Sequence, residues 1–275
     1  MIKLLSANFS RLIKDKVFWI GIAVMLAVGI LLPVMGYADA RRYGYVANID
    51  GRFFTCSMFV GVIVAIFCSL YIGTEYSDGT IRNKIVIGHK RYSIYLANFI
   101  TVATVGVAMC AAYFIAHLCL GLPLLGAFVS DAKTVVLFVL VVLLFTCAFS
   151  SIFVCVSMLC SNKAVSAIVC VLFAVAIVLI GLMLNGMLEA PRTVPSYVMG
   201  EDGVPVIAEI PNPKYLDGAM RAFVQTVYDI LPGGQVMQCL LLKAANLELL
   251  PIYSLIIAGL TTGAGVFFFQ RKELK

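Results

Sequence analysis

The sequence predicts an all-α integral membrane protein with six transmembrane helices, an N-terminal amphipathic interface helix and an outer helical loop before the last span. Apolar residues make up 62% of the 275 positions and charged residues only 12%, about half the charged share of a soluble domain. Mean hydropathy is +1.04. This composition excludes an ordinary soluble enzyme and a disordered chain. It leaves no room for a separate soluble domain, so residues 1–275 are treated as one transmembrane domain.

Residues 1–16 are predicted to form an amphipathic helix in the membrane interface. Apolar side chains recur there at spacings that share one helical face: Ile2, Leu5, Phe9, Leu12 and Ile13. A simple basic flank of the first span is the alternative. A cleaved signal peptide is disfavoured because the apolar run that follows, 17–37, is longer than the about 7–15 residues of a signal core.

Six apolar runs are predicted to cross the membrane as helices, since about 20 apolar residues suffice for one crossing. They lie at about 17–37, 57–74, 94–121, 134–160, 164–187 and 251–270. The third and fourth runs exceed the ~30 Å hydrocarbon core at about 1.5 Å per residue. We therefore expect these two helices to tilt, bend or project beyond the core.

Six spans place both termini on one side of the membrane, and the distribution of Lys and Arg identifies that side. The segments on the side of the termini hold Lys and Arg at roughly three times the density of the opposite segments. Both termini and the loop 75–93 are therefore predicted to be cytoplasmic, and 188–250 extracellular. The chain would be a multi-pass protein of the cell (plasma) membrane. Its net charge of +6 reports this topology, so no nucleic-acid partner is expected.

The outer segment 188–250 is expected to combine irregular chain with helices. Residues 191–213 are rich in proline and glycine and are expected to be irregular. Asn212-Pro213 resembles a helix N-cap followed by proline at the first helical position, and an apolar helical stripe follows it. The run 236–247 is too short to span, so we expect a helix that dips into the outer leaflet or packs on the bundle.

The residues that several kinds of chemistry require are missing. The sequence contains no P-loop, no H-E-x-x-H and no G-x-S-x-G motif. The predicted spans hold no Asp, Glu, Lys or Arg, which argues against an ion-coupled transporter and an intramembrane hydrolase. His117 is expected to be a hydrogen-bonded histidine rather than a proton carrier. Only Cys56 and Cys239 are expected outside the membrane. A disulfide between these two cysteines is less favoured than two free thiols. No metal site is expected.

The stretch that follows the second span is the most informative part of the chain. Residues 71–84 read Tyr-Ile-Gly-Thr-Glu-Tyr-Ser-Asp-Gly-Thr-Ile-Arg-Asn-Lys. A carboxylate ends the span, Asp78-Gly79 predicts a turn, and Thr80 is a candidate cap of a short helix. An ordinary polar loop with positive flanks is the alternative, and composition alone favours it.

Two motifs and their order resemble the permease subunits of type-2 ABC exporters, which are numerous in Gram-positive bacteria. The first motif is Glu75-Tyr-x-x-Gly-Thr-Ile-Arg82 after the second span. The second lies in the outer segment and reads Asn212-Pro-x-Tyr-Leu-x-Gly218, followed by Leu231-Pro-Gly-Gly-Gln235. Together with the amphipathic N-terminal helix and the six spans, the resemblance covers essentially the whole chain.

The resemblance implies that two permease subunits form the transport path and that two separate ABC ATPase subunits dock on their cytoplasmic face. ATP and Mg would be bound by the ATPase partner, so this chain would carry no cofactor and would not be an enzyme by itself. The resemblance assigns ATPase docking to a coupling helix: Glu75, Tyr76, Ser77, Asp78, Gly79, Thr80, Ile81, Arg82, Asn83 and Lys84. It assigns a second cytoplasmic contact to the turn Ser161, Asn162 and Lys163.

The side chains of the coupling segment give these assignments a physical basis. Glu75 can pair with a cation on the N-terminal helix or on the partner. Ile81 offers an apolar knob to a groove, and Arg82 offers a forked donor to a carboxylate.

The leading functional hypothesis is export of an amphipathic or hydrophobic substrate, such as a peptide, a lipid-like molecule or a drug, because the spans are uncharged. The alternative is a non-transporting membrane sensor or anchor that recruits a cytoplasmic partner. A membrane enzyme is disfavoured by the missing catalytic residues. The sequence does not distinguish a homodimer from a heterodimer of permease subunits. Gly259 and Gly263 would suit a close helix contact, either between subunits or within one.

Overall fold

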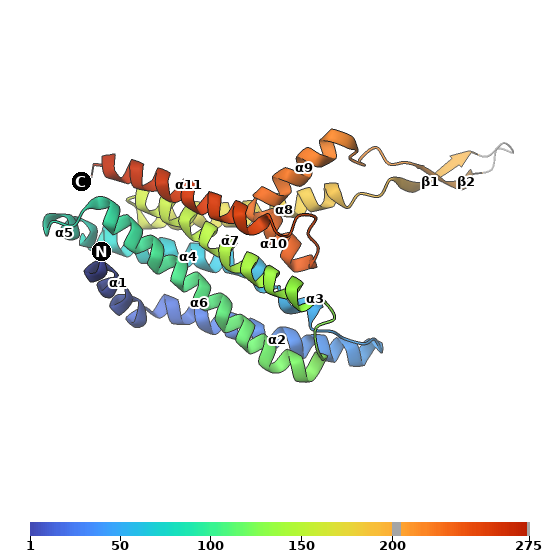
Figure 1. The fold of residues 1–275 in the computed structure, drawn as a ribbon, viewed down its shortest axis with the longest axis horizontal. Coiled ribbons are helices and arrows are strands. Elements are labelled where there is room, and N and C mark those ends of the chain that lie inside the picture. Colours follow the sequence, from blue (N-terminus) through green and yellow to red (C-terminus); the bar gives the residue numbers. More distant parts are fainter. Residues whose placement is uncertain (200–204, 274–275) are drawn as a thin grey trace.

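The computed structural model describes residues 1–199 and 205–273. Its elements in chain order are α1 (Ile2–Lys14), α2 (Lys16–Tyr43), α3 (Asp50–Phe53), α4 (Cys56–Ser77), α5 (Thr80–Val86), α6 (Arg91–Leu125), α7 (Ala132–Leu159), α8 (Lys163–Leu188), β1 (Thr193–Met199), β2 (Pro205–Pro211), α9 (Gly218–Ile230), α10 (Pro232–Leu241) and α11 (Leu250–Arg271). The long helices form an elongated bundle (Figure 1). We call the end with both termini, α1 and α5 the termini end, and the opposite end, with α3 and β1–β2, the hairpin end.

Within the described residues, six helices are long and apolar enough to cross a membrane: α2, α4 with the short α3 before it, α6, α7, α8 and α11. The predicted fold class, an all-α integral membrane protein with six spans, is confirmed. The helices run past most of the expected span ends. Their last turns therefore include charged residues such as Asp39 in α2 and Glu75 in α4, which the predicted spans did not contain.

The centre of the bundle is formed by α4, α6 and α7, which contact one another, while α2 packs on α6 and α11 packs on α7. Small residues let these helices approach closely. A Cβ added to Gly106 of α6 would lie 2.6 Å from the Thr146 methyl group of α7. Along α7, the rings of Phe149 and Phe153 stack with centroids 5.7 Å apart, so one face of this helix is filled by aromatic side chains.

The helix α1 packs against α6, and its buried face differs from the predicted stripe. The buried residues are Leu4, Asn8 and Leu12, whereas Ile2 and Ile13 of the predicted stripe are exposed. The reason is that Asn8 makes buried hydrogen bonds to α6, and these bonds set the rotation of α1. Apolar spacing alone therefore misplaced the contact face by part of a turn.

The expectation of irregular chain at 191–213 is wrong, because most of this segment forms a hairpin. Strands β1 and β2 pair antiparallel, from Thr193 opposite Pro211 to Met199 opposite Pro205. Both strands are edge strands, so a proline that lacks an N–H donor can point its backbone nitrogen away from the partner. The predicted irregularity at 200–204 lies outside the described residues.

The predicted N-cap at Asn212 is also wrong. The side chain of Asn212 instead accepts a hydrogen bond from the Lys214 N–H at 3.0 Å and donates one to the Pro191 carbonyl oxygen at 2.9 Å. These bonds close the base of the hairpin. The helix α9 starts six residues later, at Gly218, where Asp217 is the cap and accepts from the Gly218 N–H at 2.7 Å.

The short helix α10 packs on the bundle, which is one of the two expected arrangements. It begins at Pro232, four residues before the expected run, and lies against α8 through glycines. A Cβ added to Gly233 would lie 1.9 Å from the carbonyl oxygen of Ile177 in α8. In this packed region Cys56 and Cys239 are both buried with free thiols, so the alternative of a disulfide between them does not hold.

Two further expectations are settled by packing. His117 is fully buried, and neither ring nitrogen has a hydrogen-bond partner among residues 1–199 and 205–273, so the predicted hydrogen bond is wrong. Its ring instead packs on Phe53 and Tyr113, with centroids 5.5 and 5.4 Å away.

A Cβ added to Gly259 or Gly263 would meet no atom of the described chain within 4 Å. A close contact within the subunit is therefore excluded for that part of the chain.

Candidate coupling site

The predicted coupling segment forms a turn and a short helix at the termini end (Figure 1). α4 continues to Ser77, and the chain then turns at Gly79, whose φ of 67° is a left-handed value that suits glycine. α5 begins at Thr80 itself, so the capping position belongs to Gly79 rather than to Thr80 as expected. A second left-handed glycine, Gly88 with φ 98°, returns the chain to α6.

Glu75 lies at the centre of a buried polar network. Its Oε1 atom accepts hydrogen bonds from Arg11 Nη1 at 2.6 Å and from Lys84 Nζ at 2.5 Å. Its Oε2 atom accepts a bond from Asn98 Nδ2 at 3.1 Å. The side chain of Glu75 is 0% exposed. A carboxylate so buried is tolerated only when its charge is paired and its lone pairs are satisfied.

The same network extends along α1 through Asn8. Its Nδ2 donates to Asn98 Oδ1 at 2.8 Å, and its Oδ1 accepts from Lys84 Nζ at 3.2 Å. Tyr71 Oη donates to the Asn8 carbonyl oxygen at 3.0 Å, and the Arg11 guanidinium lies 3.6 Å from the centroid of the Tyr71 ring. We call this set the Glu75 network: Asn8, Arg11, Tyr71, Glu75, Lys84, Asn98 and Thr101. It joins α1, α4, α5 and α6.

The ten residues predicted for docking divide into a surface set and a buried set. Ser77, Asp78, Arg82 and Asn83 are exposed. Tyr76, Gly79, Thr80 and Lys84 are half-buried, and Glu75 and Ile81 are buried. Ile81 is 1% exposed and belongs to the core, so the expectation of an apolar knob at this position is wrong. The expected pairing of Glu75 with a cation of the N-terminal helix is present.

Sequence reasoning missed the exposed apolar pair at the end of α5. Val86 and Ile87 are 80% and 77% exposed. The signal was available, because the three adjacent β-branched residues between Lys84 and Gly88 lie outside a span and do not fit an ordinary solvated loop. They give the surface of α5 an apolar end beside the cation of Arg82.

The second predicted contact lies directly beside the first. Ser161, Asn162 and Lys163 are exposed, and Lys163 Nζ donates to Thr74 Oγ1 of α4 at 3.0 Å. A Cβ added to Gly73 would lie 2.7 Å from Lys163, so the turn rests on α4. A groove of about 560 Å³ lies between the end of α4 and the start of α8, and its lining consists of Leu70, Ser77, residues 161–164 and Ala167. The structure therefore brings both predicted contacts into one surface.

The C-terminal end of α11 is tied to the same region. Lys272 Nζ donates to the Met158 carbonyl oxygen at 3.0 Å and to Tyr76 Oη at 3.1 Å, and Tyr76 Oη donates to the same carbonyl oxygen. Burial lowers the pKa of the Lys272 ammonium group. These contacts explain why Tyr76 is half-buried, and sequence reasoning did not identify them.

Comparison with known families agrees with this geometry. A family model described as ABC-2 family transporter protein matches residues 4–185, more than half of the chain. The chain belongs to the ABC-2 transporter family. The match contains most of α1, the Glu75 network and both predicted contacts, and it ends before β1. Members of this family are membrane components of ABC transporters, so the ABC-2 chain works with ABC ATPase subunits. No curated protein matches the chain.

Proposed function

We propose that this ABC-2 chain is the permease subunit of an ATP-driven exporter in the cell membrane. A second permease subunit, identical or not, completes the path, and two separate ATPase subunits bind ATP and Mg. The observation that carries the proposal is the Glu75 network, which fixes α5 and α1 to α4 and α6 directly beside an exposed, mixed polar and apolar surface.

The proposed docking surface consists of the exposed face of α5 and the turn 161–163. Arg82 supplies a forked cation for a carboxylate of the ATPase, and Val86 and Ile87 supply apolar area. A movement of the ATPase would displace α5. Because Lys84 of α5 is bound to buried Glu75, the displacement would pass to α4 and α6 as a rigid-body movement.

The docking experiment compares two charge reversals. Arg82→Glu is expected to weaken ATPase docking at least tens-fold and to abolish export, because losing a desolvated ion pair costs about 2–5 kcal/mol. Arg192→Glu, an exposed residue at the hairpin end that binds Tyr215 Oη at 2.9 Å, is the matched control. Docking is measured as the ATPase recovered with the purified permease. Equal recovery with both variants would contradict the proposal.

The proposed orientation places the termini end in the cytoplasm. Many of the Lys and Arg residues that predicted this side gather there, including Arg82, Lys90 and Lys163, and positive loops stay inside. Single cysteines at Ser77 and Ser196 on a cysteine-depleted background test it. An impermeant thiol reagent should label S196C in intact cells and S77C only after permeabilisation. The reverse pattern would contradict the orientation.

An amphipathic or hydrophobic substrate is proposed because the charged residues of the six spanning helices lie in their end turns. A path along such helices favours apolar surface over a small ion. ATP-dependent uptake into inverted vesicles, measured with an amphipathic fluorescent probe, tests this. The same probe level in the vesicles with and without ATP hydrolysis would contradict an ATP-driven exporter, and no accumulation under either condition would favour the sensor or anchor.

A further inference from the structure

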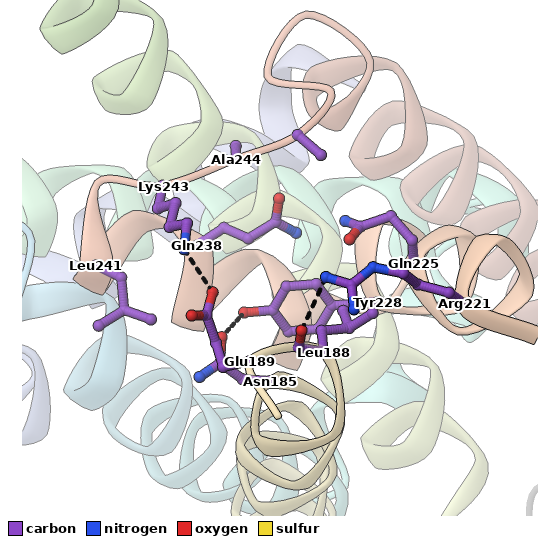
Figure 2. A pocket seen from close by; sticks show the side chains of 11 residues that line it. Asn185, Leu188, Glu189, Arg221, Gln225, Tyr228, Gln238, Leu241, Lys243 and Ala244 are labelled. Atoms are coloured by element: carbon purple, nitrogen blue, oxygen red, sulfur yellow. Dashed lines mark hydrogen bonds and ion pairs between the residues drawn. The ribbon is translucent and has the colours of Figure 1, made fainter. Parts of the chain in front are cut away.

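A second pocket, far from the coupling site, lies where α8, α9 and α10 meet (Figure 2). Its volume is about 240 Å³, which corresponds to about eight water molecules at ~30 Å³ each. It is lined by Asn185, Leu188 and Glu189, by one face of α9 and by the end of α10 with the chain that follows. Most of its wall lies outside residues 4–185, the part that matches the family model.

The unusual feature of this pocket is the side chain of Gln238. It is 1% exposed, and neither its Nε2 nor its Oε1 atom has a hydrogen-bond partner in the part of the chain that the structure describes. An unpaired buried amide costs free energy, and native proteins rarely leave one without a partner. In Figure 2 the carboxamides of Gln225 and Gln238 point toward one another across the pocket. A group that both donates and accepts a hydrogen bond would supply the partner that the Gln238 carboxamide lacks.

Charged side chains surround these two carboxamides. Arg221 donates to the Leu188 carbonyl oxygen at 2.9 Å, and Lys243 pairs with Glu189 at 2.7 Å. The lining thus holds two cations and one carboxylate. A second carboxylate, Asp229, lies behind Gln225, is buried, and accepts hydrogen bonds from Gln225 and Asn246, each at 2.8 Å. Among the described residues Arg221 makes no ion pair, so it is the cation that a ligand with one negative charge would meet.

The position of the pocket indicates where such a ligand comes from. α8 is a spanning helix that ends at Leu188, so its last turn lies where the hydrocarbon core meets the lipid headgroups. Met183 and Met187 of the same helix are exposed apolar side chains. Leu188 and Leu241 add apolar walls to the pocket. On the cytoplasmic and matrix faces of membranes, basic pockets between spanning helices bind phospholipid headgroups, and the lining of this pocket offers the same kind of donors.

We propose that this pocket binds the headgroup of an anionic, hydroxyl-bearing glycerophospholipid. The phosphodiester lies between Arg221 and Lys243, which together supply forked and point-charge donors. A headgroup hydroxyl occupies the gap between Gln225 and Gln238, donating to one carboxamide oxygen and accepting from Gln238 Nε2. This site goes beyond the proposed export function and depends only on the chain being embedded in a membrane, not on its orientation or on an ATPase.

The test uses the full chain, purified in detergent and stripped of lipid, with thermal unfolding as the readout. Short-chain phosphatidylglycerol is expected to raise the midpoint. Short-chain phosphatidylethanolamine and phosphatidylcholine, and free glycerol phosphate without acyl chains, are expected to have little effect. Gln238→Leu and Arg221→Gln should each weaken phosphatidylglycerol binding about tenfold or more. Lys133→Gln, a cation outside the pocket whose nearest carboxylate, Glu248, is 3.9 Å away, should bind like the unchanged chain.

Every other outcome overturns the proposal. Equal stabilisation by the zwitterionic lipids would remove the role of the negative charge, and equal stabilisation by glycerol phosphate would make the ligand a soluble phosphate. Stabilisation by an acetylated peptide amide but not by lipid would assign the gap to a peptide. Unchanged binding by both Gln238→Leu and Arg221→Gln, or no lipid effect at all, would leave water as the partner of Gln238. If Gln238→Leu does not fold, Arg221→Gln alone decides, against Lys133→Gln.

Discussion

Replacing Glu75 by Gln tests whether the buried network holds the coupling segment in place. The substitution keeps the shape and one acceptor oxygen but removes the charge that pairs with Arg11 and Lys84. Its new amide group also faces donors, since Asn98 Nδ2 approaches the carboxylate at 3.1 Å. We expect α5 and α1 to loosen from the bundle while the six spans stay inserted.

The magnitude follows from the contacts. Two charge-assisted hydrogen bonds, each worth about 1.5–3 kcal/mol, are lost or weakened, and breaking a buried ion pair costs about 3–5 kcal/mol. The Arg11 side chain is one-third exposed, so it can turn partly to water. We therefore expect the free energy of unfolding to fall by an amount near the lower limit, about 3 kcal/mol. This decrease lowers the unfolding midpoint by about 6–12 °C.

The assay is thermal unfolding of the purified chain at fixed detergent and lipid, together with protease access to α1. The matched control is Glu248→Gln, because Glu248 and Lys133 are exposed and 3.9 Å apart, a pair worth at most about 1 kcal/mol. The double variant Arg11→Gln with Glu75→Gln should lose less stability than the two single variants lose together, because the two side chains interact. Equal midpoints for Glu75→Gln and Glu248→Gln would refute the reasoning.

Two glycine substitutions give further predictions. Gly79→Val places a β-branched residue at φ 67°, which costs about 1–2 kcal/mol, and is expected to misdirect α5 and reduce ATPase recovery. Gly44→Val, at φ 70° near the hairpin end, is the matched control, and a similar loss from both would argue against a specific role for α5. Gly233→Ala places a Cβ 1.9 Å from the Ile177 carbonyl oxygen, so α10 is expected to shift from α8 and the unfolding midpoint to fall by several degrees. Gly186→Ala, with open space around it in the described chain, should leave the midpoint unchanged or raise it, and equal midpoints would show that the close approach is unimportant.

The six spanning helices could be predicted because the bilayer imposes one requirement on every segment, a long apolar helix with internal hydrogen bonds. That requirement does not depend on which helices are neighbours. The rotation of α1 does depend on a neighbour, because Asn8 bonds to Asn98 on a distant part of the chain. The hairpin was not predicted from the sequence for a related reason. Proline and glycine usually interrupt strands, but a ribbon of two edge strands tolerates them.

Parts of the site were visible in the sequence as polar residues within apolar runs. Asn98 interrupts the third run, and Gln238 interrupts the run 236–247. A polar side chain in such a place needs a partner, yet a search restricted to charged groups passed over both. What sequence could not supply is the identity of the partner. Asn98 finds Glu75 and Asn8, whereas Gln238 finds none within the described chain.

The order of synthesis gives the Glu75 network a role in biogenesis. Every member, from Asn8 to Thr101, belongs to the first 101 residues of the chain. Domains and subdomains form from the N-terminus as the chain emerges, so these contacts become available once α6 has entered the membrane. The packing of α10, by contrast, requires Gly181 and Ile177 of α8 and waits for the second half of the chain. The part of the proposed docking surface built by α1, α4, α5 and α6 can thus be assembled before the turn 161–163 and the end of α11 are translated.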